Sequence, residues 1–208
     1  MIIEENKLYH IYNQGNNKQK IFFSPENYLF FLKKIKLHIL PHADILAWCL
    51  MPNHFHLMVY VHTLEISDSD QSETYVIARK VRNLNDSIGV ILRTYTRAIN
   101  KQENRSGSLF KPHTKAESIT EIKGISFSLD NTSNGAEFTQ QITVEEYPQI
   151  CFNYIHGNPV KAKLVRQPED WEFSSYRDYC GLRNGKLISK ARASSFGLQV
   201  SLVSDSLT

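Results

Sequence analysis

Two apolar stretches, residues 45–51 and 54–61, follow one another with only Pro52 and Asn53 between them. This arrangement limits the fold more than any other feature of the chain. Each stretch has the length of a β-strand, and strands joined by so short a connection pair with each other in antiparallel fashion. The sequence therefore predicts a buried β-hairpin.

The remaining patterns supply elements that would cover such a hairpin. Ser24 and Pro25 suit the cap and first turn of a helix, and Pro41 ends the helical pattern that follows. Strand patterns also occur at residues 7–13 and 107–116, and helical patterns at residues 87–101 and 144–157. The order of strand, helix, two strands, helix, strand and helix predicts an α+β fold with helices packed on a mainly antiparallel sheet.

A chain of 208 residues fits one domain with appendages. We assign the domain to residues 1–183. Within it, residues 62–86 are polar and are interpreted as a loop, and residues 118–143, rich in Ser, Thr, Asn and Gly, as an insertion. Residues 184–208 carry little pattern and are interpreted as a C-terminal tail.

Charge and cysteine content narrow the function classes only a little. The 24 basic and 21 acidic residues give a net charge of +3, which is compatible with nucleic-acid binding without indicating it. The 3 cysteines include no pair at metal-ligand spacing, which favours a reduced, cytoplasmic protein. The polar, acidic N-terminus does not resemble a signal peptide, and no apolar run has the roughly 18 residues needed to span a membrane.

The second strand of the hairpin begins with two histidines, His54 and His56, in the segment MPNHFHLMV. Because strand side chains alternate between faces, both imidazoles point the same way and Phe55 points the other way. Two neutral imidazoles on one face can bind a divalent metal. The alternative is that they are polar residues on an exposed sheet face. Zinc is a possible metal, although no third His or Cys stands at a convincing zinc spacing.

The segment FNYIHGNPVK places Tyr154 and Asn158 four residues apart at the end of the last predicted helix. That spacing brings them to the same helical face, where the Asn158 carboxamide could be a third metal ligand near the tyrosine hydroxyl. A phenol is mostly protonated at neutral pH, and nearby positive charge would help to ionise it for nucleophilic attack. The alternative is a tyrosine packed at the rim of the core and an ordinary helix stop before a proline.

Four segments in this order resemble the single-tyrosine HUH transposases, and most of all their REP-associated tyrosine transposase branch: YHIYNQGNNKQKIFF, LAWCLMPNHFHLMVYV, RTYTRAINKQENRSGSLFKPHTKA and NYIHGNPVKAKLV. The resemblance covers roughly residues 7–183. It implies an RRM-like (ferredoxin-like) fold, recognition of single-stranded or hairpin DNA, and cleavage and rejoining through a 5′-phosphotyrosine intermediate. It also implies Tyr154 as the nucleophile and Mg²⁺ or Mn²⁺ at His54, His56 and Asn158. Relatives act as monomers or as homodimers, and the sequence leaves that choice open.

Positive charge fits this resemblance, because phosphates attract basic side chains without sequence recognition. The predicted DNA-binding residues are Arg93, Arg97, Lys101, Arg105, Lys111, Lys115 and Lys161. The first four form a basic stripe along the helix predicted at residues 87–101 and just beyond it, and a solvated helix face is the alternative interpretation. Three aromatic residues, Tyr12, Tyr95 and Phe110, could stack on unpaired bases.

The sequence departs from these relatives at two places, and it leaves three functions open. Gln14 stands where relatives often carry an arginine before Gly-Asn-Asn, and the 118–143 insertion is longer than usual. The first function is a metal-dependent tyrosine transposase, the second a DNA-binding module whose catalysis has lapsed, and the third a zinc-dependent hydrolase. Tyr95 is a rival nucleophile, although its apolar neighbours favour a core position.

Overall fold

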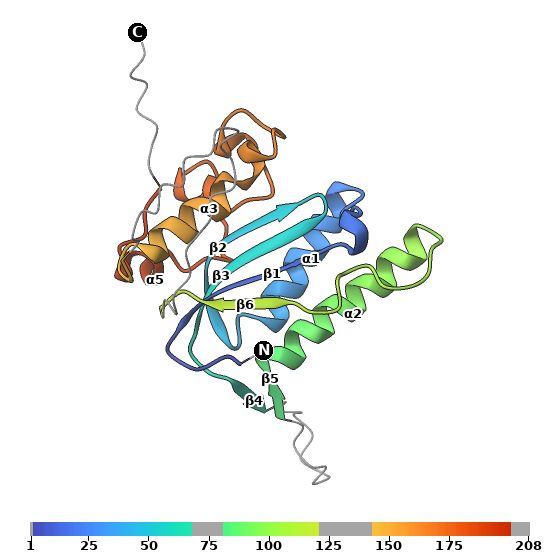
Figure 1. The fold of residues 1–208 in the computed structure, drawn as a ribbon, viewed down its shortest axis with the longest axis horizontal. Helices are drawn as coiled ribbons and strands as arrows, with labels where there is room; N and C mark the ends of the chain where they lie inside the picture. Colours follow the sequence, from blue (N-terminus) through green and yellow to red (C-terminus); the bar gives the residue numbers. More distant parts are fainter. Residues whose placement is uncertain (1, 68–80, 121–142, 201–208) are drawn as a thin grey trace, which may run out of the picture.

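The centre of the molecule is a four-stranded sheet with every pairing antiparallel. The computed structural model describes residues 2–67, 81–120 and 143–200. The sheet has the order β2-β3-β1-β6, made of β1 (Leu8–Gln14), β2 (Ala43–Met51), β3 (His54–Val61) and β6 (Lys115–Ser118) (Figure 1). With α1 (Pro25–His38) after β1 and α2 (Leu84–Gln102) before β6, these elements follow the ferredoxin-like βαββαβ order. The expected α+β fold is confirmed.

The β2–β3 hairpin is present as predicted. Met51 pairs with His54 at the turn and Ala43 with Val61 at the far end, with a register shift between Ile45 and Ala47. β1 lies on the other side of β3, so that β3 is flanked by strands on both edges. This central position explains why nearly every residue of β3 is buried.

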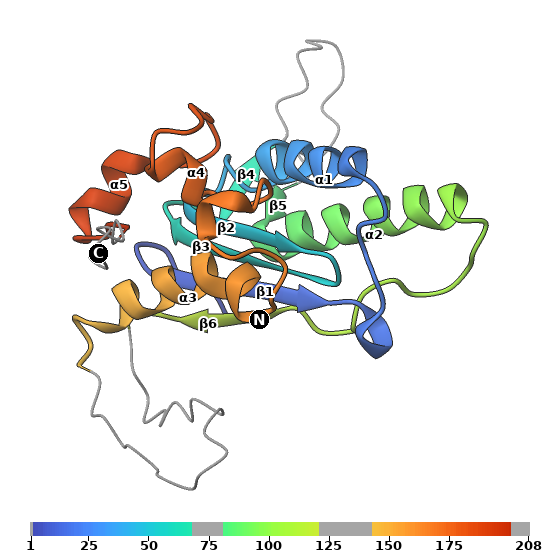
Figure 2. The same ribbon diagram turned by 90° about the horizontal axis from the view of Figure 1, so that it is seen from above.

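Helices α1 and α2 lie together on one face of the sheet (Figure 2). Ser24 begins α1 in a capping box with Asn27, and Asn83 begins α2 by accepting a hydrogen bond of 2.8 Å from the Asp86 backbone. The apolar side of α2, including Ile91 and Tyr95, is buried against the sheet. Burial of each such side chain stabilises the fold by about 1.5–3 kcal/mol.

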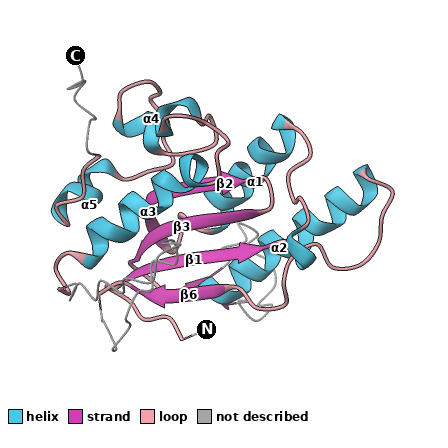
Figure 3. Cartoon of the chain, turned by 45° about the horizontal axis from the view of Figure 1, so that its top comes forward, coloured by secondary structure: helices cyan, strands magenta, loops and turns pink. Residues whose placement is uncertain are grey.

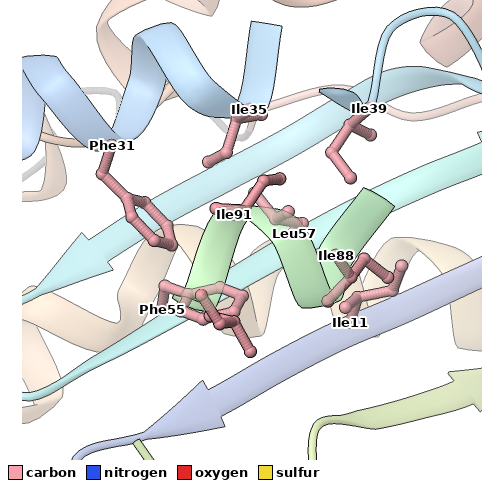
Figure 4. A pocket seen from close by; sticks show the side chains of 9 residues that line it. Ile11, Phe31, Ile35, Ile39, Phe55, Leu57, Ile88 and Ile91 are labelled. Atoms are coloured by element: carbon pink, nitrogen blue, oxygen red, sulfur yellow. The ribbon is translucent and has the colours of Figure 1, made fainter. Parts of the chain in front are cut away.

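A cavity of about 10 Å³ remains inside this core, between α1, α2 and the sheet (Figure 4). Its lining is entirely apolar and includes Ile11, Phe31 and Leu57. A space of this size without polar partners does not suit a water molecule, still less a substrate. The functional site therefore has to be sought on the other face of the sheet.

That other face is covered by α3 (Tyr147–Lys161), which crosses the strands on the side away from α1 and α2 (Figure 3). Phe152 and Ile155 of α3 pack on Met58 of β3 in a second apolar core. The helix was expected to end at residue 157 before Pro159, but it continues through Pro159 to Lys161. Proline removes one backbone donor without ending this helix, whose last turn still closes with a 2.9 Å hydrogen bond from the Ala162 backbone to the Asn158 carbonyl.

Several shorter elements complete the described chain. They are η1 (Asn16–Lys18), β4 (Glu65–Ser67), β5 (Val81–Asn83), η2 (Pro168–Asp170), α4 (Tyr176–Tyr179) and α5 (Lys190–Ser195). β4 and β5 form a separate antiparallel pair, so the expected loop at residues 62–86 contains two short strands. Most of the predicted insertion, residues 121–142, lies outside the described residues.

The segment after residue 183 differs from the tail that its sequence suggested. Ala193 and Leu198 are buried in the core beneath α3, and the Ser189 backbone donates a 2.8 Å hydrogen bond to the Ile45 carbonyl of β2. Residues up to 200 therefore pack onto the domain. Within the described part of the chain, no helix combines the length and apolar character needed to cross a bilayer.

Candidate active site

His54 and His56 lie on the sheet face that α3 covers. Tyr12 of β1 is directly opposite His56 across the β1–β3 pairing, and Gln14 is opposite His54. The two imidazole centroids are 5.0 Å apart with their planes nearly perpendicular. Phe55, between them in sequence, is in the α1–α2 core on the opposite face. Strand alternation accounts for this arrangement directly.

Helix α3 brings Tyr154 over these histidines. The Tyr154 ring lies edge-on to His56 at a centroid distance of 5.5 Å and edge-on to His10 at 6.0 Å. Tyr154 is 41% exposed, although His10 and His56 beneath it are buried. Tyr154 is therefore the tyrosine of α3 that both faces the histidines and remains accessible to a ligand.

Asn158 lies one turn further along α3. Its side-chain Nδ2 donates a 2.9 Å hydrogen bond to the Tyr154 carbonyl. The amide oxygen, Oδ1, takes no part in this bond. A side-chain hydrogen bond also links His54 and Asn158. The structure thus brings Tyr154, His54, His56 and Asn158 into one cluster.

Burial keeps the imidazoles of His10, His54 and His56 neutral at neutral pH. Desolvation lowers the pKa of His10 to about 4 and lowers the pKa of His56 well below its ordinary value, with the neighbouring His10 and His54 adding to the effect on His56. Desolvation also lowers the pKa of His54, against a smaller opposing effect of the hydrogen bond to Asn158. Neutral imidazoles are the form that binds metals.

An open pocket of about 290 Å³ lies beside the cluster. The residues that line it come from β1, β3, β6, α3 and the segment leading into β6: Tyr12, Asn13, Gln14, His54, His56, Lys111, His113, Lys115 and Tyr154. Tyr12 donates a 2.6 Å hydrogen bond to the Glu117 carboxylate, and burial together with this bond raises the pKa of Tyr12. Lys111 and Lys115 place positive charge at the rim, where a phosphate could meet Tyr154.

The residues present fit a divalent cation. Nε2 of His56 is a buried atom that has no hydrogen-bond partner among the described residues, which is an unusual state for a buried polar atom. A lone pair at that atom, a second one on His54 and the amide oxygen of Asn158 would form a mixed nitrogen and oxygen donor set. Imidazole nitrogens suit transition metals better than Mg²⁺, so Mn²⁺ fits this set better than Mg²⁺ does.

A zinc hydrolase finds less support in these residues. Across residues 2–67, 81–120 and 143–200, no three His, Cys, Asp or Glu side chains are grouped so that they could bind one metal ion. Catalytic zinc sites commonly use three such ligands. A cation at His54 and His56 would need the Asn158 amide, water or the substrate to complete its coordination.

The predicted basic stripe is separated from this site. Helix α2, which carries Arg93, Arg97 and Lys101, packs on the opposite face of the sheet, and Arg105 follows its C-terminal end (Figure 2). Lys161 is exposed at the end of α3 but does not line the pocket. Of the seven predicted DNA-binding residues, the structure brings only Lys111 and Lys115 to the pocket, and a DNA-binding role for the others stays a prediction.

Burial excludes two of the aromatic candidates. Tyr95 is fully buried and donates a 2.7 Å hydrogen bond to the Ile21 carbonyl, so it cannot serve as the rival nucleophile or stack on a base. Phe110 is 4% exposed within the α1–α2 core. Tyr12 lines the pocket and is the one of the three that a base could reach.

Two residues that contact the histidines were not assigned a role from the sequence. His10 contacts His56 through a 2.8 Å hydrogen bond, and Asn53 bonds to His54 at 2.6 Å. Strand alternation places His10 and Tyr12 on one face, but only the register of β1 against β3 shows that this face carries His56.

Comparison with known proteins supports the fold. No family model and no curated protein matches the chain. Among solved structures, the chain is similar to a REP-associated tyrosine transposase bound to a REP hairpin, with a TM-score of 0.55 and 15% sequence identity over 98% of this chain and 97% of that one. At this identity the likeness shows a shared fold over the whole described chain.

Proposed function

We propose that the protein is a metal-dependent tyrosine transposase or related endonuclease that cleaves and rejoins single-stranded, hairpin-bearing DNA. The observation that carries this proposal is the convergence of Tyr154, His54, His56 and Asn158 beside one open pocket. These residues come from β3 and α3, about 100 positions apart in sequence, and a packing role alone does not require a phenol above two neutral imidazoles. The shared fold with a DNA-hairpin-bound transposase is consistent with the proposal.

In the proposed reaction the Tyr154 oxygen attacks a backbone phosphorus. A P–O bond to the tyrosine forms while the P–O3′ bond breaks, and the proton lost by the phenol balances the one gained by the 3′-oxygen. The product is a 5′-phosphotyrosine and a free 3′-hydroxyl. Because one phosphodiester replaces another, a 3′-hydroxyl can later reverse the attack without an external energy source.

Each remaining group has a task that its position permits. His54, His56 and Asn158 would bind the cation, which would polarise the phosphoryl oxygen under attack. Lys111 and Lys115 would attract the phosphate backbone to the rim of the pocket. Tyr12, partly buried beside the pocket and hydrogen-bonded to Glu117, would offer an aromatic face to an unpaired base.

The proposal is tested by searching for the covalent intermediate. Protein is incubated with Mn²⁺ and a labelled pool of oligonucleotides in which random single strands flank a hairpin, and adducts are separated on a denaturing gel. Wild-type protein is expected to give an adduct, and peptide mass spectrometry is expected to locate the DNA on Tyr154. Sequencing the captured DNA would then define the preferred site.

Two variants make the result specific. Tyr154→Phe should give no adduct while still binding DNA, because the ring and its packing are retained. Tyr60→Phe is the matched control, since Tyr60 lies on the same sheet face outside the pocket and bonds to the side chain of Asn6. DNA binding without any wild-type adduct would instead support the lapsed binding module.

A further inference from the structure

Both histidines of the proposed metal site are bound at the same ring atom, Nδ1, by a neighbouring side chain. Nδ1 of His54 is 2.6 Å from Oδ1 of Asn53, and Nδ1 of His56 is 2.8 Å from Nε2 of His10. In each ring this leaves Nε2 as the nitrogen that could bind a cation. The tautomer of each ring then decides whether that nitrogen carries a lone pair or a proton.

The His54 tautomer follows from the orientation of the Asn53 amide. Nδ2 of Asn53 donates a 3.2 Å hydrogen bond to the Lys18 carbonyl, so the amide oxygen is the end that faces His54. A carbonyl oxygen only accepts hydrogen bonds. Neutral His54 therefore carries its proton on Nδ1 and a lone pair on Nε2, which is the ring nitrogen left for the contact with the Asn158 side chain.

The His10–His56 hydrogen bond allows two arrangements. His56 can donate from Nδ1 to His10, which leaves a lone pair on Nε2 of His56, or it can accept from His10 and carry its proton on Nε2. The buried Nε2 of His56 has no partner among the described residues in either case. Only the first arrangement gives His56 the same ligand-competent form as His54.

We propose that His10 is a positioning residue that keeps His56 in the Nδ1–H tautomer and thereby presents Nε2 to the metal. This inference rests on the proposed function and adds to it the residue that prepares the metal ligand. Fixing the tautomer and ring orientation of a histidine ligand is the usual role of the group bound to its other nitrogen.

The packing of His10 supports this role. Its ring stacks on His56 at a centroid distance of 5.0 Å and a plane angle of 24°, and it meets Tyr154 edge-on at 6.0 Å. His10 is itself 6% exposed, and its ring also packs on the Tyr12 ring at a centroid distance of 4.7 Å. One buried side chain thus contacts both the proposed ligand and the proposed nucleophile, which restricts how far either ring can rotate.

The tautomer can be measured directly by long-range ¹H–¹⁵N NMR of ¹⁵N-histidine-labelled, metal-free protein near neutral pH. We expect Nδ1–H for His56 in the wild type and a loss of that preference in His10→Phe, which keeps an aromatic ring but removes the acceptor. His10→Gln should restore Nδ1–H, because its amide oxygen can take the place of Nε2. The His42 resonances serve as a check that the fold is intact, since His42 bonds to Ser87 away from the site.

Metal affinity provides the second measurement. Titration with Mn²⁺ alone, followed by electron paramagnetic resonance, is expected to show binding weakened about 10- to 100-fold in His10→Phe and by no more than about threefold in His10→Gln. A wild-type His56 that carries its proton on Nε2 would overturn the proposal, even if His10→Phe failed to fold. So would a His10→Phe protein with an unchanged tautomer and unchanged Mn²⁺ affinity. Absence of a DNA adduct from the wild type would refute the proposed function alone, because the tautomer is read without DNA.

Discussion

The side chain of Asn158 donates a hydrogen bond of 2.9 Å to the backbone carbonyl of Tyr154, one helical turn earlier. The bond joins the proposed third ligand to the residue proposed as nucleophile, at the point where Pro159 follows in the helix. It also orients the amide so that its oxygen, and not its nitrogen, is available as a metal ligand. The position of one group therefore depends on the position of the other.

Two substitutions of Asn158 should show whether its side-chain oxygen binds the metal. Asn158→Ala removes the oxygen donor, and we expect Mn²⁺ affinity to fall about 10-fold or more, as for the loss of other groups at metal sites. Asn158→Asp keeps an oxygen and adds charge, so Mn²⁺ affinity should be retained or increased. Titration of the metal-free proteins with Mn²⁺ measures both effects.

Asn153→Ala is the matched control for this comparison. Asn153 is exposed on the same helix and accepts a 2.7 Å hydrogen bond from Gln149. Its replacement should leave Mn²⁺ affinity unchanged. If Asn158→Ala bound Mn²⁺ as tightly as the control, Asn158 would not be a ligand.

Much of the fold followed from local patterns in the sequence. The hairpin around Pro52 was predictable because a strand pattern on each side leaves no room for another connection. The start of α1 at Pro25 was predictable from its cap, and the common face of His54 and His56 from strand alternation. These features depend only on residues close in sequence.

What the sequence left unassigned depends on contacts between distant residues. The role of His10 needs the register of β1 against β3, and the position of the α2 stripe needs the face on which α2 packs. The packing of residues 184–200 rests on a few buried side chains such as Ala193 and Leu198, which form no periodic pattern. The extension of α3 past Pro159 likewise overrides the local preference of proline.

Charge reversal should distinguish the pocket rim from the helix stripe. In Lys111→Glu/Lys115→Glu, adduct formation with short single strands should fall. The plot of log affinity against log salt should become less steep by about 1.4, for two lost phosphate contacts. In Arg93→Glu/Arg97→Glu, binding of longer hairpin DNA should weaken, because these residues form the predicted basic stripe. Adduct yield at saturating DNA should stay near wild type, because α2 lies on the opposite face of the sheet. Equal loss of adduct in both double variants would contradict this division.

Two glycines offer a matched pair for stability. A Cβ at Gly15 would lie 2.3 Å from the Gln19 backbone carbonyl, so Gly15→Ala should destabilise the protein by about 1–3 kcal/mol through overpacking. A Cβ at Gly157, inside α3, meets nothing within 4 Å, so Gly157→Ala should stabilise the protein by about 0.5–1 kcal/mol through helix propensity. Urea denaturation measures both, and a Gly15→Ala protein as stable as the wild type would show that the close approach at Gly15 is not what requires glycine there.

The buried histidine His156 should make the stability of the fold depend on pH. Its Nε2 shares a 2.7 Å hydrogen bond with the Ser175 hydroxyl, and burial lowers its pKa from 6.5 to about 3, with Asp178 opposing the shift. Between pH 6.5 and 3, His156 binds a proton in the unfolded chain but not in the folded protein. Its contribution to the free energy of unfolding is therefore fully present above pH 6.5 and is lost as the pH falls from 6.5 toward 3. Within that window the slope for one histidine is about 1.4 kcal/mol per pH unit. His156→Gln, which retains a polar partner for Ser175, should therefore show a shallower decline in the free energy of unfolding by about that amount. Urea denaturation of both proteins at a series of pH values gives the two slopes, and equal slopes would mean that His156 takes up its proton in the folded state as readily as in the unfolded chain.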